Sequence, residues 1–164
     1  MKKFLMIACM MLVSTAMFAQ KGSTWVGANV NYGMHSDYKN FGLGAKVQYE
    51  FIDNFRGEAS FNYFFKKDEL TQWDVNLNLH YLIHAGSLTV YPLAGLTLLN
   101  SSTPDVEIMG YTVKGVSDSD FGLNLGAGLD FPITEGVKLN IEAKYQIIAD
   151  WNRPVISAGV SFAL

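Results

Sequence analysis

The stretch that decides the fold is residues 41–51, which read Phe41-Gly42-Leu43-Gly44-Ala45-Lys46-Val47-Gln48-Tyr49-Glu50-Phe51. Apolar residues occupy the odd positions, and glycine or a polar residue occupies each even position. Successive side chains of a β-strand point to opposite faces of the sheet. The stretch therefore predicts a strand with one apolar face and one polar face.

The same alternation recurs to the end of the chain. The further segments are 24–34, 55–65, 71–83, 88–99, 121–131, 137–147 and 156–164. Together the eight segments predict an all-β protein, an eight-stranded antiparallel up-and-down barrel. Pro92 cannot donate a ladder hydrogen bond and a closed barrel has no edge strand, so we expect a bulge or a late start in 88–99.

The links between the segments alternate in length. Turn-forming residues fill the short links 52–54, 84–87 and 132–136. The other links are longer at 35–40, 66–70 and 100–120, although 149–153 is short again. Outer-membrane barrels have short periplasmic turns and longer outer loops, so we expect both termini to face the periplasm.

Three features indicate that the apolar face meets lipid. Aromatic residues gather at the strand ends, where membrane barrels carry aromatic girdles. Strands of about eleven residues, tilted by about 40°, span roughly 25–30 Å, the height of the apolar band of such barrels. The polar face is rich in Gly and Asn, which suits a narrow lumen filled by side chains. Because an unpaired strand edge is costly in lipid, the first and last strands must pair.

The first residues predict a cleaved signal peptide. Lys2 and Lys3 precede an apolar run at 4–13, and small residues follow. We expect cleavage after Ala19, which leaves a barrel domain at 20–164. Cleavage after Ala16 is the alternative. Cys9, the only cysteine, ends the run Ile7-Ala8-Cys9, which resembles a lipoprotein cleavage site; a lipoprotein signal is therefore an alternative to an ordinary signal peptide.

Composition sets further bounds. The chain has 164 residues, enough for one domain, and no apolar run after residue 19 is long enough for a membrane-spanning helix. Losing the two lysines of 1–19 changes the formal net charge from −3 to −5. No basic stripe indicates nucleic-acid binding.

Two runs carry a resemblance to a known family. Residues 121–130, Phe-Gly-Leu-Asn-Leu-Gly-Ala-Gly-Leu-Asp, and 91–96, Tyr-Pro-Leu-Ala-Gly-Leu, are similar to strands of the small bacterial outer-membrane β-barrels, the eight-stranded group that includes the OmpA transmembrane domain, OmpX and the opacity-type proteins. The alternating end of the chain resembles the signal that the barrel assembly machinery reads, although Leu164 replaces the usual terminal aromatic.

The resemblance implies a monomer in the outer membrane of a Gram-negative bacterium. Its expected partners are outer-membrane lipid, lipopolysaccharide and the assembly machinery, which would bind the C-terminal strand. We expect no cofactor and no metal.

The polar face supplies candidate lumen residues of both charge signs. They are Lys46, Glu50, Arg56, Glu58, Asp74, His80, Asp130, Lys138, Glu142 and Lys144. Buried charges are costly unless they are paired, and the signs nearly balance. We therefore expect a structural plug of ion pairs, with a small-solute pore as the alternative.

The longest link supplies a candidate binding surface. Its candidates are Asp105, Glu107, Met109 and Tyr111, in a segment that would extend a hairpin above the membrane. This surface predicts a non-catalytic role in envelope structure or in contact with host or environmental molecules. The alternative is a solvated loop that binds nothing and only protects the barrel.

Two rival functions remain open. His35-Ser36-Asp37 in the first outer link would place a lipid A-modifying site at the rim, although three such residues in sequence are ordinary loop chemistry. A soluble lipocalin-like carrier is the rival fold, since Gly22-Ser23-Thr24-Trp25 approaches the Gly-x-Trp start of that family. In a carrier of that kind the apolar face would point inward.

Overall fold

The structure, a computed structural model, describes residues 22–35, 38–67, 70–108, 111–149 and 151–164. The strands are β1 (Thr24–His35), β2 (Tyr38–Ile52), β3 (Phe55–Lys67), β4 (Leu70–Tyr81), β5 (Ile83–Ala85), β6 (Leu88–Ser102), β7 (Val106–Ile108), β8 (Tyr111–Val113), β9 (Ser117–Thr134), β10 (Val137–Ile148) and β11 (Arg153–Ala163). Within these ranges no helix has the length and apolar character to span a membrane. The predicted signal peptide, 1–19, and Cys9 lie outside the described residues.

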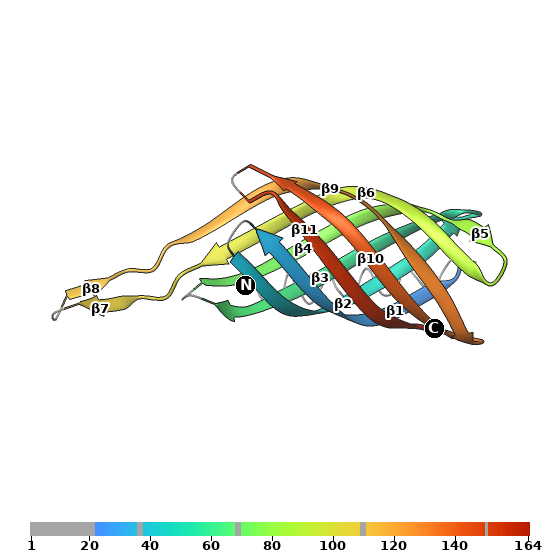
Figure 1. Cartoon of the computed structure of the whole chain (residues 1–164), viewed down its shortest axis with the longest axis horizontal. Coiled ribbons are helices and arrows are strands. Elements are labelled where there is room, and N and C mark those ends of the chain that lie inside the picture. Colours follow the sequence, from blue (N-terminus) through green and yellow to red (C-terminus); the bar gives the residue numbers. More distant parts are fainter. Residues whose placement is uncertain (1–21, 36–37, 68–69, 109–110, 150) are drawn as a thin grey trace, which may run out of the picture.

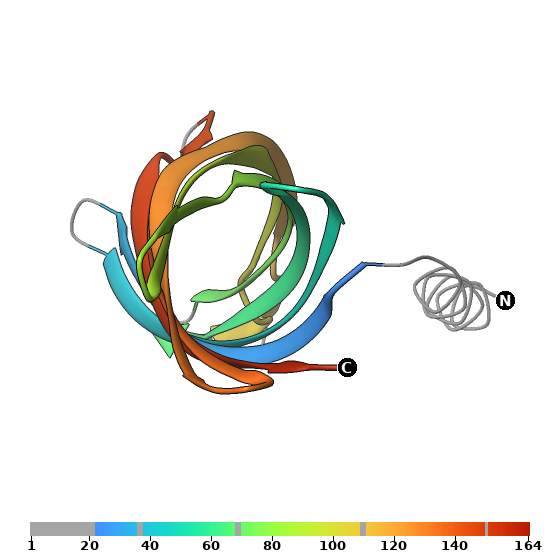
Figure 2. The same ribbon diagram turned by 90° about the vertical axis from the view of Figure 1, so that its right-hand side faces the viewer.

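The sheet closes into a barrel of eight antiparallel strands. Its order is β4-β3-β2-β1-β11-β10-β9-β6, and β4 pairs with β6 to complete the ring. β5 continues the line of β4 after one interrupting residue, so the two together form one of the eight strands. The strands tilt steeply around the axis (Figure 1), and the view along the axis shows the closed wall (Figure 2). The first and last strands pair over nine residues, as closure in lipid requires.

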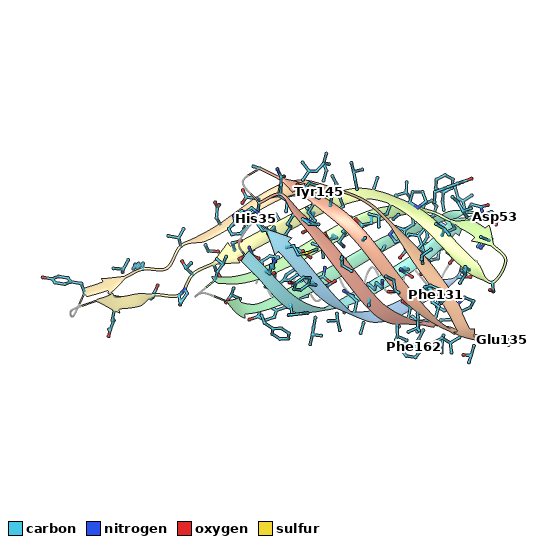
Figure 3. The ribbon with its side chains drawn as sticks, viewed as in Figure 1. His35, Asp53, Phe131, Glu135, Tyr145 and Phe162 are labelled. Atoms are coloured by element: carbon cyan, nitrogen blue, oxygen red, sulfur yellow. The ribbon has the colours of Figure 1, made fainter. Side chains whose placement is uncertain are left out.

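The apolar face points outward. Phe41, Leu77 and Ile141 are 60%, 59% and 49% exposed, whereas Lys46 and Glu142 are buried. This orientation is the reverse of that of a lipocalin-like carrier, so that rival reading is wrong. Side chains surround the wall on the outside and fill it on the inside (Figure 3).

The outward aromatic residues lie near both ends of the barrel. Figure 3 places Phe131 and Phe162 toward the end that carries Glu135, and Tyr145 toward the end that carries His35. Phe162 and Tyr145 are half exposed, and Phe131 is partly exposed. This arrangement matches the two aromatic girdles of membrane barrels.

The two ends of the barrel differ. The turn end carries the tight links 53–54, 86–87 and 135–136, where Asn54, Gly86 and Gly136 adopt positive φ. The hairpin end carries the long β6–β9 extension. The predicted longer loops at 35–40 and 66–70 are wrong, because β1, β2, β3 and β4 continue to pair to His35↔Tyr38 and Lys67↔Leu70.

Pro92 lies within a regular strand, so the expected bulge or late start is also wrong. β6 begins at Leu88 and keeps one register with β9 through Pro92↔Ala127. The irregularity falls on the neighbouring strand, where Leu82 separates β4 from β5. The Leu82 backbone N–H donates to the carbonyl oxygen of Asn54 instead, and the Asn54 side chain donates to the Leu82 carbonyl oxygen.

Glycines on the inner face make room for large side chains. A Cβ added to Gly128 would overlap the Tyr91 ring, and one added to Gly44 would overlap the Asn62 side chain. Tyr91 is fully buried. The Gly-rich alternation of β9 therefore sets where an aromatic ring fits within the lumen.

Candidate functional site

The candidate site is the interior of the barrel, where charged side chains gather in three clusters. At the turn end, Arg56 Nη1 lies 2.5 Å from Asp130 Oδ2, and Lys138 Nζ lies 3.3 Å from the same oxygen. The Arg56 guanidinium also lies 4.6 Å from the centre of the Tyr91 ring. Tyr91 in turn stacks on His80 with ring centres 4.5 Å apart. These contacts join β3 to β9 across the lumen.

The central cluster consists of two lysine–glutamate pairs. Lys46 Nζ lies 3.6 Å from Glu58 Oε2, and Lys144 Nζ lies 3.3 Å from Glu142 Oε1. All four side chains are nearly completely buried. Gln48 Nε2 donates to Glu58 Oε2 at 2.7 Å, which adds a neutral donor to this carboxylate.

The hairpin-end cluster is built around Arg153. Its Nη2 donates to Asp74 Oδ2 at 2.8 Å, its Nε to Gln146 Oε1 at 2.7 Å, and its Nη1 to Gln72 Oε1 at 3.1 Å. The guanidinium lies 4.4 Å from the centre of the Phe64 ring. One arginine on β11 therefore holds side chains from β4 and β10.

Amides connect the hairpin-end cluster to the central one. The asparagines that bond to one another or to Asp74 are Asn29, Asn31, Asn62, Asn76, Asn78 and Asn124. The path ends where Asn78 Nδ2 donates to Glu58 Oε1 at 3.2 Å. These hydrogen bonds form one network that runs from Asp74 through Asn76, Asn124 and Asn78 to Glu58.

Little space remains in this network. A hollow of about 10 Å³ lies among the central side chains, whereas a hollow of about 890 Å³ lies on the outer wall, lined mainly by outward residues such as Val30, Ile141 and Phe162. About 10 Å³ accommodates roughly one water molecule. This hollow among the central side chains is therefore too small for a ligand larger than water.

The structure buries nine of the ten predicted lumen residues. Glu50 is the exception, since it is half-buried near the turn end. Sequence reasoning missed Arg153, which it assigned to a link, and it passed over Gln48, Gln72, Gln146 and Tyr91. Ser157 and Ser161 lie on the polar face of the last strand. Counting back from Ser157 in steps of two passes Val155 and reaches Arg153, so the alternation in the sequence could have placed Arg153 on that face.

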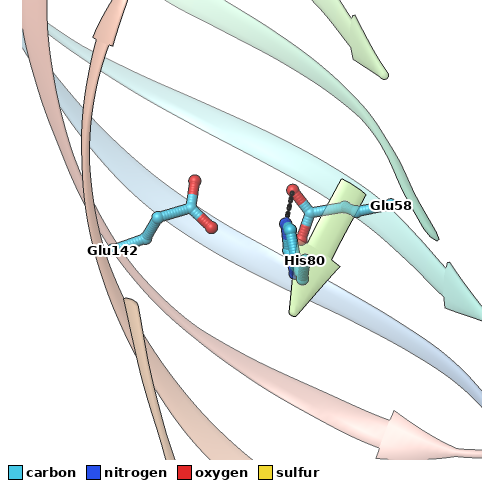
Figure 4. Close-up of side chains that lie close together, drawn as sticks. All are labelled: Glu58, His80 and Glu142. Carbon is cyan, nitrogen blue, oxygen red and sulfur yellow. Dashed lines mark ion pairs between the residues drawn. The ribbon is translucent and has the colours of Figure 1, made fainter. Parts of the chain in front are cut away.

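The histidines differ in their surroundings. His80 is buried, and one of its ring nitrogens lies within 4.8 Å of one carboxylate oxygen each of Glu58 and Glu142, which lie equally close to each other (Figure 4). His84 is exposed in β5. His35 stacks beside Trp151 with ring centres 4.5 Å apart, and Ser36 and Asp37 of the suggested rim site lie outside the described residues.

The sequence matches the family model of the outer membrane protein beta-barrel domain over residues 5–163. The chain belongs to this family. Comparison with curated proteins gives no match.

Solved structures show the same fold for this outer membrane barrel. The N-terminal barrel of OprF from Pseudomonas aeruginosa matches with 18% identity and a TM-score of 0.67, covering 88% of this chain and all of the other. Neisserial surface protein A matches with 17% identity and a TM-score of 0.67, covering 87% and 97%. Ail, the attachment invasion locus protein of Yersinia pestis, matches with 18% identity and a TM-score of 0.62, covering 87% and 97%.

The outer membrane barrel extends a hairpin well past the other strands at the hairpin end (Figure 1). β7 and β8 form its tip, and the Thr103 backbone N–H donates to the Val116 carbonyl oxygen at its base. Of the predicted loop candidates, Glu107 and Tyr111 are exposed, Asp105 is exposed and accepts a hydrogen bond from the Gly115 backbone, and Met109 lies outside the described residues.

Proposed function

We propose that this protein is a non-catalytic outer-membrane barrel whose lumen is closed by its own side chains and whose hairpin makes contacts at the cell surface. The hairpin is the observation that carries the proposal. An anchor in the membrane needs strands only as long as the apolar band, yet β9 has 18 residues, and β7 and β8, which precede it in the chain, form a further ribbon at its outer end.

The side chains of the hairpin suit a contact surface. Tyr111 is 80% exposed and Val116 is 70% exposed, and Val113 is also exposed. Large exposed apolar groups in one protruding segment mark an interaction site. Both outer edges of a two-stranded ribbon carry unpaired backbone groups, which can bind an extended segment of another chain.

The charge of the hairpin narrows the class of partner. Residues 103–120 contain four acidic residues, Asp105, Glu107, Asp118 and Asp120, against the single Lys114. Ail has been solved with the heparin analogue sucrose octasulfate. An acidic hairpin would repel such a polyanion, so we propose a partner that combines basic and apolar groups.

Binding by the purified barrel tests the proposal. Residues 104–115 are replaced by Asn-Gly, a two-residue turn that suits the hydrogen-bonded pair Thr103 and Val116. Both proteins are placed in nanodiscs of zwitterionic lipid and mixed with beads coated with a basic protein or with heparin. We expect binding to the basic beads that is lost with the hairpin, and the folded barrel band must persist on the gel. Equal binding by the two proteins would contradict a role for the hairpin.

The closed lumen has its own test. Three clusters of paired charges and the amides between them support closure, and the alternative is a small-solute pore. In planar bilayers we expect no sustained channel openings from the wild-type protein. Sustained large openings would favour the pore instead.

The proposal also covers the export of the protein, its anchoring in the membrane, its assembly and its oligomeric state. We propose that residues 1–19 direct export, that lipid and lipopolysaccharide surround the wall, that the assembly machinery binds β11, and that the barrel is a monomer. Sequencing of the protein from isolated outer membranes should give Gln20 as its first residue.

A further inference from the structure

Three side chains from opposite walls converge at the centre of the lumen. Glu58 belongs to β3, His80 to β4 and Glu142 to β10, and β10 lies four strands away from β3 around the ring. Figure 4 shows both carboxylates turned toward the imidazole. His80 Nε2 lies 3.9 Å from Glu58 Oε1, too far for a direct hydrogen bond.

The contacts of His80 fix which ring nitrogen carries the hydrogen. Arg56 Nε lies 3.1 Å from His80 Nδ1, and Arg56 Nη2 lies 3.0 Å from the same atom. A guanidinium group can only donate, so Nδ1 accepts and the neutral ring carries its hydrogen on Nε2. This buried Nε2 has no hydrogen-bond partner among the described residues. The histidine therefore has an unused N–H on the ring nitrogen that lies 3.9 Å from Glu58 Oε1.

The spacing of the three atoms separates the possible ligands. A point equidistant from three atoms that are up to 4.8 Å apart lies up to about 2.8 Å from each, the length of a hydrogen bond to water. A zinc ion with bonds of about 2.1 Å needs ligand atoms no more than about 3.6 Å apart. The separation of 3.9 Å between His80 Nε2 and Glu58 Oε1 already exceeds that limit.

Charge and protonation also exclude a metal ion. Lys46 pairs with Glu58 and Lys144 pairs with Glu142, so both carboxylates are already compensated. A divalent cation would add two uncompensated charges in a buried space. It would also need a free lone pair on His80 Nε2, which the Arg56 contacts deny.

We propose that a single buried water molecule binds at this point. It accepts a hydrogen bond from His80 Nε2–H and donates one each to Glu58 and Glu142. Its two donors and one acceptor match the groups presented. A hollow of about 10 Å³, the volume of about one water, lies on the other side of the same two glutamates and does not include His80 in its lining. The water links β3, β4 and β10, and the inference rests on the closed lumen proposed above.

Nuclear magnetic resonance of the wild-type barrel in nanodiscs tests the site without altering the lumen. The variants His35→Asn and His84→Asn, changed outside the network, assign the His80 signals by elimination. We expect a protonated Nε2, an unprotonated Nδ1, and cross-relaxation between Hε2 and water with opposite signs in the NOE and ROE experiments, the mark of a long-lived water. A tenfold excess of Zn²⁺ should leave the His80 shifts unchanged.

Other outcomes would overturn the inference. A protonated Nδ1, the absence of cross-relaxation to water, or a Zn²⁺-induced shift that a chelator reverses would each do so. Sustained channel openings in a bilayer would contradict the closed lumen, whereas a barrel without such openings and without the long-lived water would contradict only the water site. The two failures are therefore distinguishable.

Discussion

Arg153 is the side chain whose loss should weaken the barrel most clearly. It is 1% exposed and donates to Asp74, Gln146 and Gln72. The variant Arg153→Met keeps much of the aliphatic volume but removes the charge. Breaking one partner from a buried ion pair costs about 3–5 kcal/mol, because the remaining charge is left uncompensated.

The surroundings of Asp74 place the cost near the lower end of that range. Asn62 and Asn76 each donate to Asp74 Oδ1 at 2.7 Å, so the carboxylate keeps two short hydrogen bonds after the arginine is lost. We therefore expect the free energy of unfolding to fall by about 3 kcal/mol. That change lowers the folding equilibrium constant by a factor of about 100.

Urea unfolding in detergent, followed by the mobility of folded and unfolded bands, measures this change. Lys114→Met on the exposed hairpin is the matched control and should shift stability by no more than about 0.5 kcal/mol. In the double variant Arg153→Met with Asp74→Asn, the loss of unfolding free energy should be about 2 kcal/mol smaller than the sum of the losses in the two single variants, because neither charge is then left alone. A loss below about 1 kcal/mol, or additive effects in the double variant, would mean that the Arg153–Asp74 pair does not stabilise the barrel in this way.

Three further predictions concern the lumen and the wall. Glu58→Leu should lower the melting temperature of the heat-modifiable band more than Glu58→Gln does, because only leucine leaves every donor around this position unmatched; equal melting temperatures would contradict this. Gly128→Ala should cost about 1–3 kcal/mol in urea unfolding because its methyl group meets the Tyr91 ring, whereas Gly57→Ala, whose nearest neighbour would be 3.6 Å away, should be nearly neutral. Leu77→Arg should cost about 2–4 kcal/mol when the barrel folds into lipid vesicles, and a neutral effect there would argue against contact with lipid.

The sequence predicted the strands of the barrel wall far better than the side-chain contacts inside the barrel. Alternation predicts the inner face of each strand without any knowledge of the neighbouring strands, and it placed Lys46, Glu58 and Glu142 on the face that the structure buries. The pairing within one hairpin follows from register, since Gln48 lies opposite Glu58. Contacts across the lumen do not follow, because they depend on how far the strands slide past one another when the sheet closes.

Arg153 and Pro92 illustrate the two kinds of error. Arg153 was lost because Pro154 and the neighbouring polar residues resemble a link, although β11 begins at Arg153 itself. Pro92 was expected to interrupt its own strand, β6. The interruption lies instead at Leu82, between β4 and β5 on the neighbouring strand. The lengths of the β1–β2 and β3–β4 hairpins were underestimated because backbone pairing continues beyond the apolar alternation on which the strand limits were based.

The most direct test of the account is the environment of nitroxide labels at Leu77 and Ile141, with Tyr111 as the water-exposed control. Lipid-facing labels collide often with dissolved oxygen and seldom with a polar nickel complex, labels in water collide with both, and labels packed inside a protein collide with neither. An apolar face that contacts lipid predicts the lipid pattern at Leu77 and Ile141 and the water pattern at Tyr111. Protection of Leu77 and Ile141 from both reagents would contradict it.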